Sequence, residues 1–206
     1  STSYTSSFES YSSASDVSGD GLWETGVNFK AFVVASGSTP STSTGPSSAY
    51  AGSYYAYCET TNPNHPGASF DLQTTEFSTP IESVAFYYMA YGATIGTVSL
   101  QGSSDASSWT TLWSKNGNFG RNWKSASVSV PNAKYLRFYY VGGSSYTGDL
   151  ALDSITINTV PAPSAVPTPS PTSPQPTPRP SPIPISAPTK MPTPVPSGIP
   201  VSSPTP

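Results

Sequence analysis

The sequence is poor in charged residues and in the side chains that most often bind metals or form cross-links. Only 9% of its 206 residues are charged, and it has one cysteine and one histidine. A single cysteine excludes an intrachain disulfide, and one cysteine with one histidine is too few for a zinc site. The fold must therefore be held by packing alone or with the help of another metal.

Long apolar runs and a surplus of basic residues are also missing. No run approaches the roughly 20 apolar residues of a membrane helix, so no transmembrane segment is predicted in this chain. The start is rich in Ser and Thr and does not resemble a signal peptide, which indicates a mature fragment or an excerpt of a longer chain. The formal net charge is −3, which argues against nucleic acid as a partner because phosphate binding needs a basic surface. Low charge with abundant Ser, Thr, Gly and Tyr favours an extracellular protein, secreted or displayed at the cell surface.

Proline divides the chain into two parts. From Pro161 to Pro206, 18 of the 46 residues are proline and none is aromatic. Such a segment cannot build a core and favours extended polyproline II structure. We predict one folded domain at residues 5–158 and a disordered Pro/Ser/Thr-rich stalk or linker at residues 159–206. The alternative role of the tail is a ligand for proline-reading domains.

The folded part shows the period-two alternation of β-strands and no sustained helical period. Turn-forming Gly, Pro and Asn residues separate the expected strands, which are residues 28–34, 53–58, 67–72, 83–91, 96–101, 110–114, 124–130, 135–141 and 151–157. Short strands at this spacing predict an all-β sandwich or barrel.

Three of these strands carry informative side chains. Residues 84–91 are largely apolar on both faces, which predicts a central strand with residues 135–141 as its neighbour. Arg137 in that neighbour is either a solvated or ion-paired arginine or a ligand contact on a sheet face. In the last strand, alternation places Asp153 on one face with Ile155 and Ile157, where a carboxylate needs a partner.

Short motifs follow one another in a fixed order along most of the folded part. They are Phe8-Glu9, Trp23 after Asp16 and Asp20, Gly45-Pro46-Ser47, the run 54–59, the run 84–89 with Gly92, Leu112-Trp113, Gly120-Arg121-Asn122-Trp123 and Gly148-Asp149-Leu150-Ala151-Leu152-Asp153. In this order the chain resembles the MAM domain family, named for meprin, a neuropilin-type antigen and receptor tyrosine phosphatase mu.

The resemblance implies a jelly-roll β-sandwich of two antiparallel sheets, found in extracellular parts of adhesion receptors and secreted proteases, where it mediates recognition or assembly. This chain lacks the cysteines of animal members: a serine stands shortly before Phe8, and no cysteine follows Ile157. Assembly roles that depend on disulfides are therefore in doubt.

A structural Ca²⁺ is the metal that the sequence best accommodates, because calcium takes oxygen ligands from carboxylates and carbonyls at strand ends. The terminal strands of a jelly roll commonly run side by side, which would bring Glu9 and Asp153 together, with Asp20 joining from the loop before Trp23. Related jelly-roll modules often carry calcium in that region. The alternative is that Glu9 and Asp153 accept hydrogen bonds or pair with a lysine.

Aromatic side chains offer a second kind of site. Trp109 and Tyr146, with Trp113 and Trp123, are candidates for a groove that stacks on sugar rings. The alternative is that most of the tryptophans belong to the core, with Trp109 in its turn as the exception.

No arrangement of residues indicates a catalytic site, since no nucleophile–base pair and no phosphate loop is recognisable. The sequence predicts a non-enzymatic extracellular recognition or adhesion module on a proline-rich stalk, with protein or glycan ligands at the cell surface. The alternatives are a carbohydrate-binding accessory module and an appended domain of a secreted protease or other enzyme.

Overall fold

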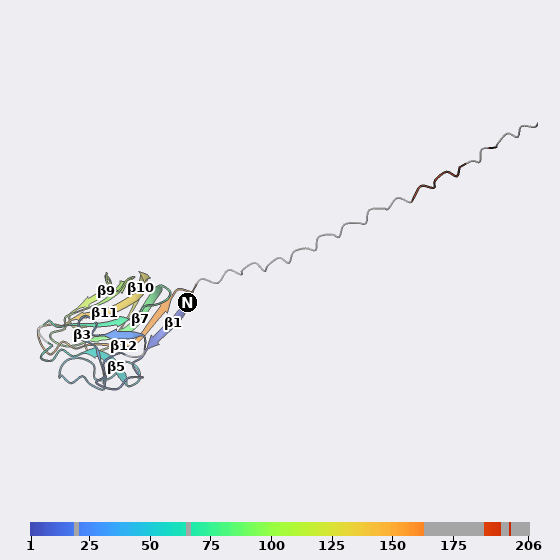
Figure 1. The fold of residues 1–206 in the computed structure, drawn as a ribbon. Coiled ribbons are helices and arrows are strands. Elements are labelled where there is room, and N and C mark those ends of the chain that lie inside the picture. Colours follow the sequence, from blue (N-terminus) through green and yellow to red (C-terminus); the bar gives the residue numbers. More distant parts are fainter. Residues whose placement is uncertain (19–20, 65–66, 163–187, 195–197, 199–206) are drawn as a thin grey trace, which may run out of the picture. The chain divides into compact units, whose positions relative to one another are not determined.

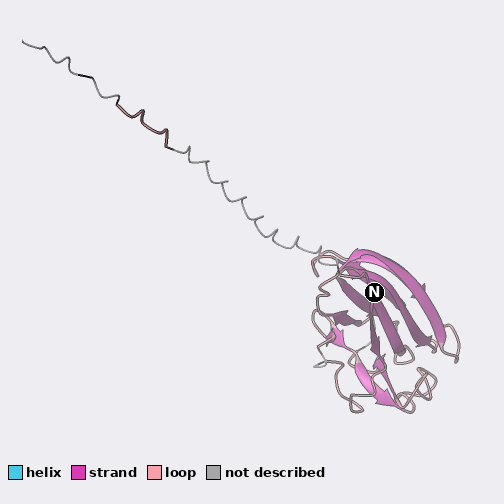
Figure 2. Cartoon of the chain, turned by 90° about the vertical axis from the view of Figure 1, so that its right-hand side faces the viewer, coloured by secondary structure: helices cyan, strands magenta, loops and turns pink. Residues whose placement is uncertain are grey.

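The chain folds into two stacked β-sheets (Figures 1 and 2). The computed structural model describes residues 1–18, 21–64, 67–162, 188–194 and 198. The first sheet has the strand order β10-β7-β12-β5-β4, with β1 paired to β12. Its strands are β1 (Thr2–Ser6), β4 (Val33–Ser36), β5 (Tyr54–Cys58), β7 (Ile81–Ala90), β10 (Lys124–Ala133) and β12 (Leu150–Thr159).

The second sheet has the strand order β2-β6-β11-β8-β9. Its strands are β2 (Trp23–Thr25), β3 (Lys30–Ala31), β6 (Ser69–Thr74), β8 (Thr97–Ser103), β9 (Thr110–Asn116) and β11 (Tyr135–Val141). Strand β3 adds to β6 in parallel, and all other pairs in the two sheets are antiparallel. The predicted all-β sandwich is confirmed.

Strand pairing differs from the sequence prediction at one central point. Strand β7 is central, as predicted, but its neighbours are β10 and β12. The predicted neighbour, residues 135–141, is β11 of the other sheet, where it lies between β6 and β8. The two strands lie in different sheets and face each other across the sandwich, so each is apolar on its inner face. The prediction was wrong because this shared pattern looks like that of two neighbouring strands in one sheet.

The core fills the space between the sheets and includes Phe8, Trp23, Phe70, Phe86 and Phe138. A second cluster lies on the outer face of the first sheet, where Tyr55, Tyr57 and Met89 pack with partly buried Trp123. Because this outer face is also covered, strand β5 is buried on both sides at Tyr55–Cys58.

A bulge in β12 shifts the side-chain alternation just after Asp153. The register with β7 shifts between Asp153 and Thr156, and Ser154 has a φ of 48°. Leu152, Ile155 and Ile157 therefore all face the core, whereas Asp153 pairs with Tyr87 on the other face. The expectation that Asp153 shares a face with Ile155 and Ile157 is wrong, because one extra residue reverses the alternation.

The two ends of the domain lie side by side, as the jelly-roll resemblance implies. Strand β1 pairs with β12 over five residues, from Thr2 with Thr159 to Ser6 with Ile155. Glu9 lies in the segment just after β1.

The folded domain belongs to the unit Ser1–Ala165, and residues 166–206 form a separate unit of the chain. Most of the predicted stalk lies outside the described residues, and its described residues 188–194 have no helix or strand. No helix in the described part of the chain is long and apolar enough to cross a membrane.

Candidate functional site: an arginine–aromatic face

The outer face of the second sheet carries polar and aromatic side chains in place of an apolar cover. On β11, Leu136, Phe138 and Tyr140 point into the core, so Arg137 and Tyr139 point outward. Arg137 is in register with Gln73 of β6 and Gln101 of β8. We call this surface the arginine–aromatic face and define it by Phe29, Gln73, Gln101, Trp109, Arg137 and Tyr139.

Arg137 lies at the centre of this face, and only 9% of its surface is exposed. Its Nε and Nη2 atoms both donate to Oε1 of Gln101, at 2.9 and 2.6 Å. The guanidinium carbon lies 4.2 Å from the ring centre of Trp109 and 5.4 Å from that of Tyr139. Burial lowers the pKa of Arg137, and the negative charge of Asp71 opposes this shift.

Arg137 has no carboxylate partner within salt-bridge distance in the part of the chain that the structure describes, where Lys134–Glu76 is the one ion pair. Burying a cation is unfavourable unless it is compensated. Here the compensation comes from the electron-rich faces of the aromatic rings and from Gln101. This leaves a positive group available on an outer sheet face.

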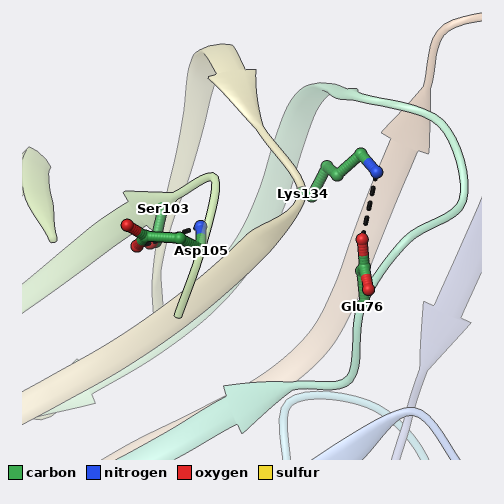
Figure 3. A network of polar contacts seen from close by, with 4 residues as sticks. All are labelled: Glu76, Ser103, Asp105 and Lys134. Atoms are coloured by element: carbon green, nitrogen blue, oxygen red, sulfur yellow. Dashed lines mark hydrogen bonds and ion pairs between the residues drawn. The ribbon is translucent and has the colours of Figure 1, made fainter. Parts of the chain in front are cut away.

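The turn that follows β8 holds Trp109 over Arg137. Oδ1 of Asp105 accepts hydrogen bonds from the backbone amides of Ser107 and Ser108, at 2.9 and 2.8 Å, and from the Ser103 hydroxyl at 3.0 Å. Figure 3 shows Asp105 beside Ser103, next to the Lys134–Glu76 ion pair. The amides of Ser108 and Ser107 hold the pKa of Asp105 well below its usual range. The turn is therefore tied at several points just before Trp109.

A second tied loop places Phe29 on the same face. Both carboxylate oxygens of buried Asp71 accept backbone amides, from Val27 and from Asn28, each at 3.1 Å. Gly26 takes a φ of 66°, which glycine adopts without strain. Phe29 remains 39% exposed and packs on Tyr139, with ring centres 4.9 Å apart.

Gln73 contributes an unusual polar atom to this face. Its side chain is 5% exposed, and its Oε1 is a buried acceptor without a hydrogen-bond partner among the described residues. Buried amide oxygens are nearly always paired, because leaving one unpaired costs free energy. Gln73 therefore has a hydrogen-bonding position next to Arg137 that the described residues leave unused.

The structure does not bring the four predicted aromatic residues into one groove. Trp113 packs on Phe86 in the core, and Trp123 packs on Tyr55 outside the first sheet. Tyr146 is 45% exposed and lies beyond the end of β11 where Val141 pairs with Thr97, whereas Trp109 lies beyond the opposite end of β8. Trp109 as a ligand contact stays a prediction, and Tyr146 is separated from it.

Glu9 and Asp153 bind the same loop rather than meeting directly. Oδ2 of Asp153 accepts the amides of Tyr50 and Ala51, at 2.8 and 3.1 Å. Oε1 of Glu9 accepts the amides of Ser53 and Tyr54, both at 2.9 Å. These contacts match the alternative prediction for Glu9 and Asp153, in which both carboxylates accept hydrogen bonds.

Asp20 lies outside the described residues. Within the described ranges, no group of three or more His, Cys, Asp or Glu side chains is arranged to hold a metal ion.

The calcium site at Glu9, Asp20 and Asp153 stays a prediction, and thermal melting tests it. If calcium links these carboxylates, adding it raises the melting temperature and a chelator lowers it, because a ligand that binds only the folded state stabilises that state. Identical melting curves in calcium and in chelator would contradict the site.

Several residues of the arginine–aromatic face were not identified from the sequence. The sequence marks Arg137 as a possible ligand contact, but not Gln73, Gln101 or Phe29. It also gives no indication that Asp71 holds the loop of Phe29. Alternation within β6 and β8 places both glutamines on polar faces, which is the available signal. The sequence does not show that β11 lies between those two strands.

Comparisons with known proteins identify relatives for most of the folded part. The family model described as MAM domain, meprin/A5/mu, matches residues 14–162. The MAM domain-containing glycosylphosphatidylinositol anchor protein 1 of Rattus norvegicus is 33% identical over 130 residues, which are 57% of this chain and 13% of that protein. Zonadhesin of Oryctolagus cuniculus is 32% identical over 131 residues, which are 58% of this chain and 6% of that protein. The chain thus matches only a small part of each relative.

Solved structures share the fold at lower sequence identity. The K2 cleaved adhesin domain of Lys-gingipain aligns with a TM-score of 0.57 and 18% identity over 77% of this chain and all of that chain. The K1 adhesin domain from Porphyromonas gingivalis W83 aligns with a TM-score of 0.55 and 20% identity, over 78% of this chain and all of that chain. At such identities the likeness concerns the fold.

Proposed function

Because the chain belongs to the MAM domain family, we propose that it is a non-enzymatic extracellular recognition and adhesion module whose ligand surface is the arginine–aromatic face. The observation that carries the proposal is Arg137: a buried cation without a carboxylate partner among the described residues, held under Trp109 on an outer sheet face. Arginine and aromatic residues are the side chains most enriched where proteins bind their ligands and partners.

The cost of keeping Arg137 buried supports this role. A well-packed apolar side chain usually stabilises a buried position as well as or better than a charge does. The aromatic rings around it come from two loops that are each tied down by a carboxylate, Asp105 for Trp109 and Asp71 for Phe29. A ligand surface on pre-ordered loops loses little conformational entropy on binding.

The chemistry of the remaining reactive groups supports a non-enzymatic module. Cys58 is fully buried, and burial raises the pKa of its thiol well above the ordinary value. Nucleophilic cysteines need the opposite shift, toward the thiolate. His65 lies outside the described residues. In the proposal the proline-rich segment carries the module as a stalk, and the parent protein is membrane-associated or secreted.

The test is binding of the multimerised chain to arrays of secreted proteins and of glycans. Replacing Trp109 with Ala is expected to weaken binding about tenfold or more, because it removes a stacking surface and exposes Arg137 to water. Tyr146→Ala is the matched control, since Tyr146 is also an aromatic residue at the surface, 45% exposed, but lies at the other end of the sheet. Undiminished binding by Trp109→Ala, with loss in Tyr146→Ala, would contradict the proposed surface.

A further inference from the structure

We propose that the ligand of the arginine–aromatic face is a neutral polysaccharide chain, bound through adjacent hydroxyl groups of a pyranose ring. This inference rests on the proposed function, because it assigns a ligand class to the same surface. It follows from which hydrogen-bonding groups on the face are satisfied and which are not.

Two neighbouring groups on this face have unused hydrogen-bonding capacity. Arg137 directs Nε and Nη2 to Gln101, and its Nη1 has no partner in the described part of the chain, so the face offers donors. Gln73, in register with Arg137 on the next strand, offers an acceptor, since its buried Oε1 has no partner among the described residues. A complementary ligand must therefore accept and donate hydrogen bonds at adjacent positions.

Hydroxyl groups satisfy both requirements, since each has one donor and two acceptor positions. Of two adjacent sugar hydroxyls, one accepts from Arg137 and the other donates to Gln73. A carboxylate or phosphate only accepts, so it would pair with Arg137 and leave Oε1 of Gln73 without a donor. The charge of the domain also disfavours an acidic ligand, because all 11 acidic residues precede residue 160, together with only six of the eight basic residues.

The aromatic residues favour a sugar over a peptide, which also has both donors and acceptors. A pyranose ring has an apolar face that stacks on an aromatic ring while its hydroxyls point outward from the rim. Trp109 and Arg137 provide these two kinds of contact side by side, with the guanidinium carbon 4.2 Å from the indole centre. One sugar can therefore stack and form hydrogen bonds at the same time.

The layout of the face indicates a chain rather than a single sugar. Trp109 belongs to the turn after β8, and Phe29 belongs to the loop bound by Asp71 of β6. Strand β11 with Arg137 lies between β6 and β8. Aromatic surfaces thus flank the hydrogen-bonding centre on both sides, which matches successive rings of a polysaccharide.

The experiment measures binding of the full chain to soluble polysaccharides by affinity electrophoresis and calorimetry. The probes are neutral glucan, mannan, galactan and xylan, the fully O-methylated form of each, and polygalacturonate. We expect binding to at least one neutral polymer. We also expect at least a tenfold weaker affinity for its methylated form, because methylation removes every hydroxyl donor and keeps the oxygen acceptors.

Gln73→Leu is the decisive variant, because it separates binding from folding. It is expected to weaken binding to the neutral polymer about tenfold, while the melting temperature stays equal or rises because an unpaired buried oxygen is removed. Arg137→Met should lose binding as well, and Tyr146→Ala should retain it. A purely structural role for Gln73 would leave binding unchanged.

Three results would overturn the inference: no binding to any neutral polymer at millimolar sugar concentrations, equal binding of the methylated form of the polymer that binds, or wild-type binding by Gln73→Leu. These outcomes can be distinguished from a failure of the proposed function. If Trp109→Ala still abolishes binding to a protein on the arrays, the face is a recognition surface for proteins and only the ligand class is wrong.

Discussion

Replacing Asp149 with Asn is expected to stabilise the domain at neutral pH and to remove most of the pH dependence of its stability. Asp149 is fully buried. Its Oδ1 accepts the backbone amide of Thr60 at 3.0 Å and the Thr60 hydroxyl at 2.9 Å. Its Oδ2 has no hydrogen-bond partner among the described residues. The charged form is thus poorly compensated, and the neutral form suits the site better.

The sign of the effect follows from the pKa. Burial, opposed by the Thr60 amide, raises the pKa of Asp149 from 3.8 to about 6. A carboxyl group with a raised pKa in the folded state contributes stability below the unfolded value, and this contribution is lost as the pH rises through the folded value. Over its whole titration Asp149 should therefore lower the free energy of unfolding by about 3 kcal/mol, of which about 2 kcal/mol falls between pH 4.5 and pH 7.5.

Urea denaturation at pH 4.5 and pH 7.5 measures this effect. The wild-type chain should be more stable at the lower pH, and Asp149→Asn should lose most of the difference while keeping the Thr60 contacts through its amide oxygen. Burial also raises the pKa of Asp153, so a smaller dependence of the same sign should remain. A variant as pH-dependent as the wild type would show that Asp149 is not the group responsible.

Replacing Asp153 with Ala is expected to destabilise the domain by about 3 kcal/mol, because it leaves three backbone amides without a charged acceptor. One is the amide of Ser154, and the other two belong to Tyr50 and Ala51. They hold the loop whose Tyr50 ring stacks on Tyr87, with ring centres 3.5 Å apart. The loop should therefore detach from the outer face of the first sheet.

Glu9→Ala is the matched control for this change. Glu9 accepts two amides of the same loop, but its contacts are exposed to solvent, where water replaces a lost partner at little cost. Its loss of stability should be clearly smaller in denaturant titrations, and Asp153→Asn should fall between the two. Equal losses in Asp153→Ala and Glu9→Ala would show that burial does not decide the strength of these contacts.

Asp153 shows what the side-chain pattern of a sequence can predict and what it cannot. Its isolation as a carboxylate in an apolar strand was visible directly, and so was the need for partners. The partners themselves, the amides of Tyr50 and Ala51, lie about a hundred residues earlier in the chain. The bulge at Ser154 turns Ile155 and Ile157 to the core, and its trace in the sequence is that Ile155 follows Leu152 by three positions rather than two.

The sequence by itself determined the all-β class, most strand positions and the central position of β7, because side-chain alternation and turn residues are local properties. The order of its motifs also indicated the family. Strands β1 and β2 were missed, since they are short and largely polar. Only the tertiary structure decided that β11 belongs to the second sheet, and that Gln73, Arg137 and Gln101 lie in one row under two tied loops. Strand pairing is a long-range choice among similar patterns, and the arginine–aromatic face exists only once that choice is made.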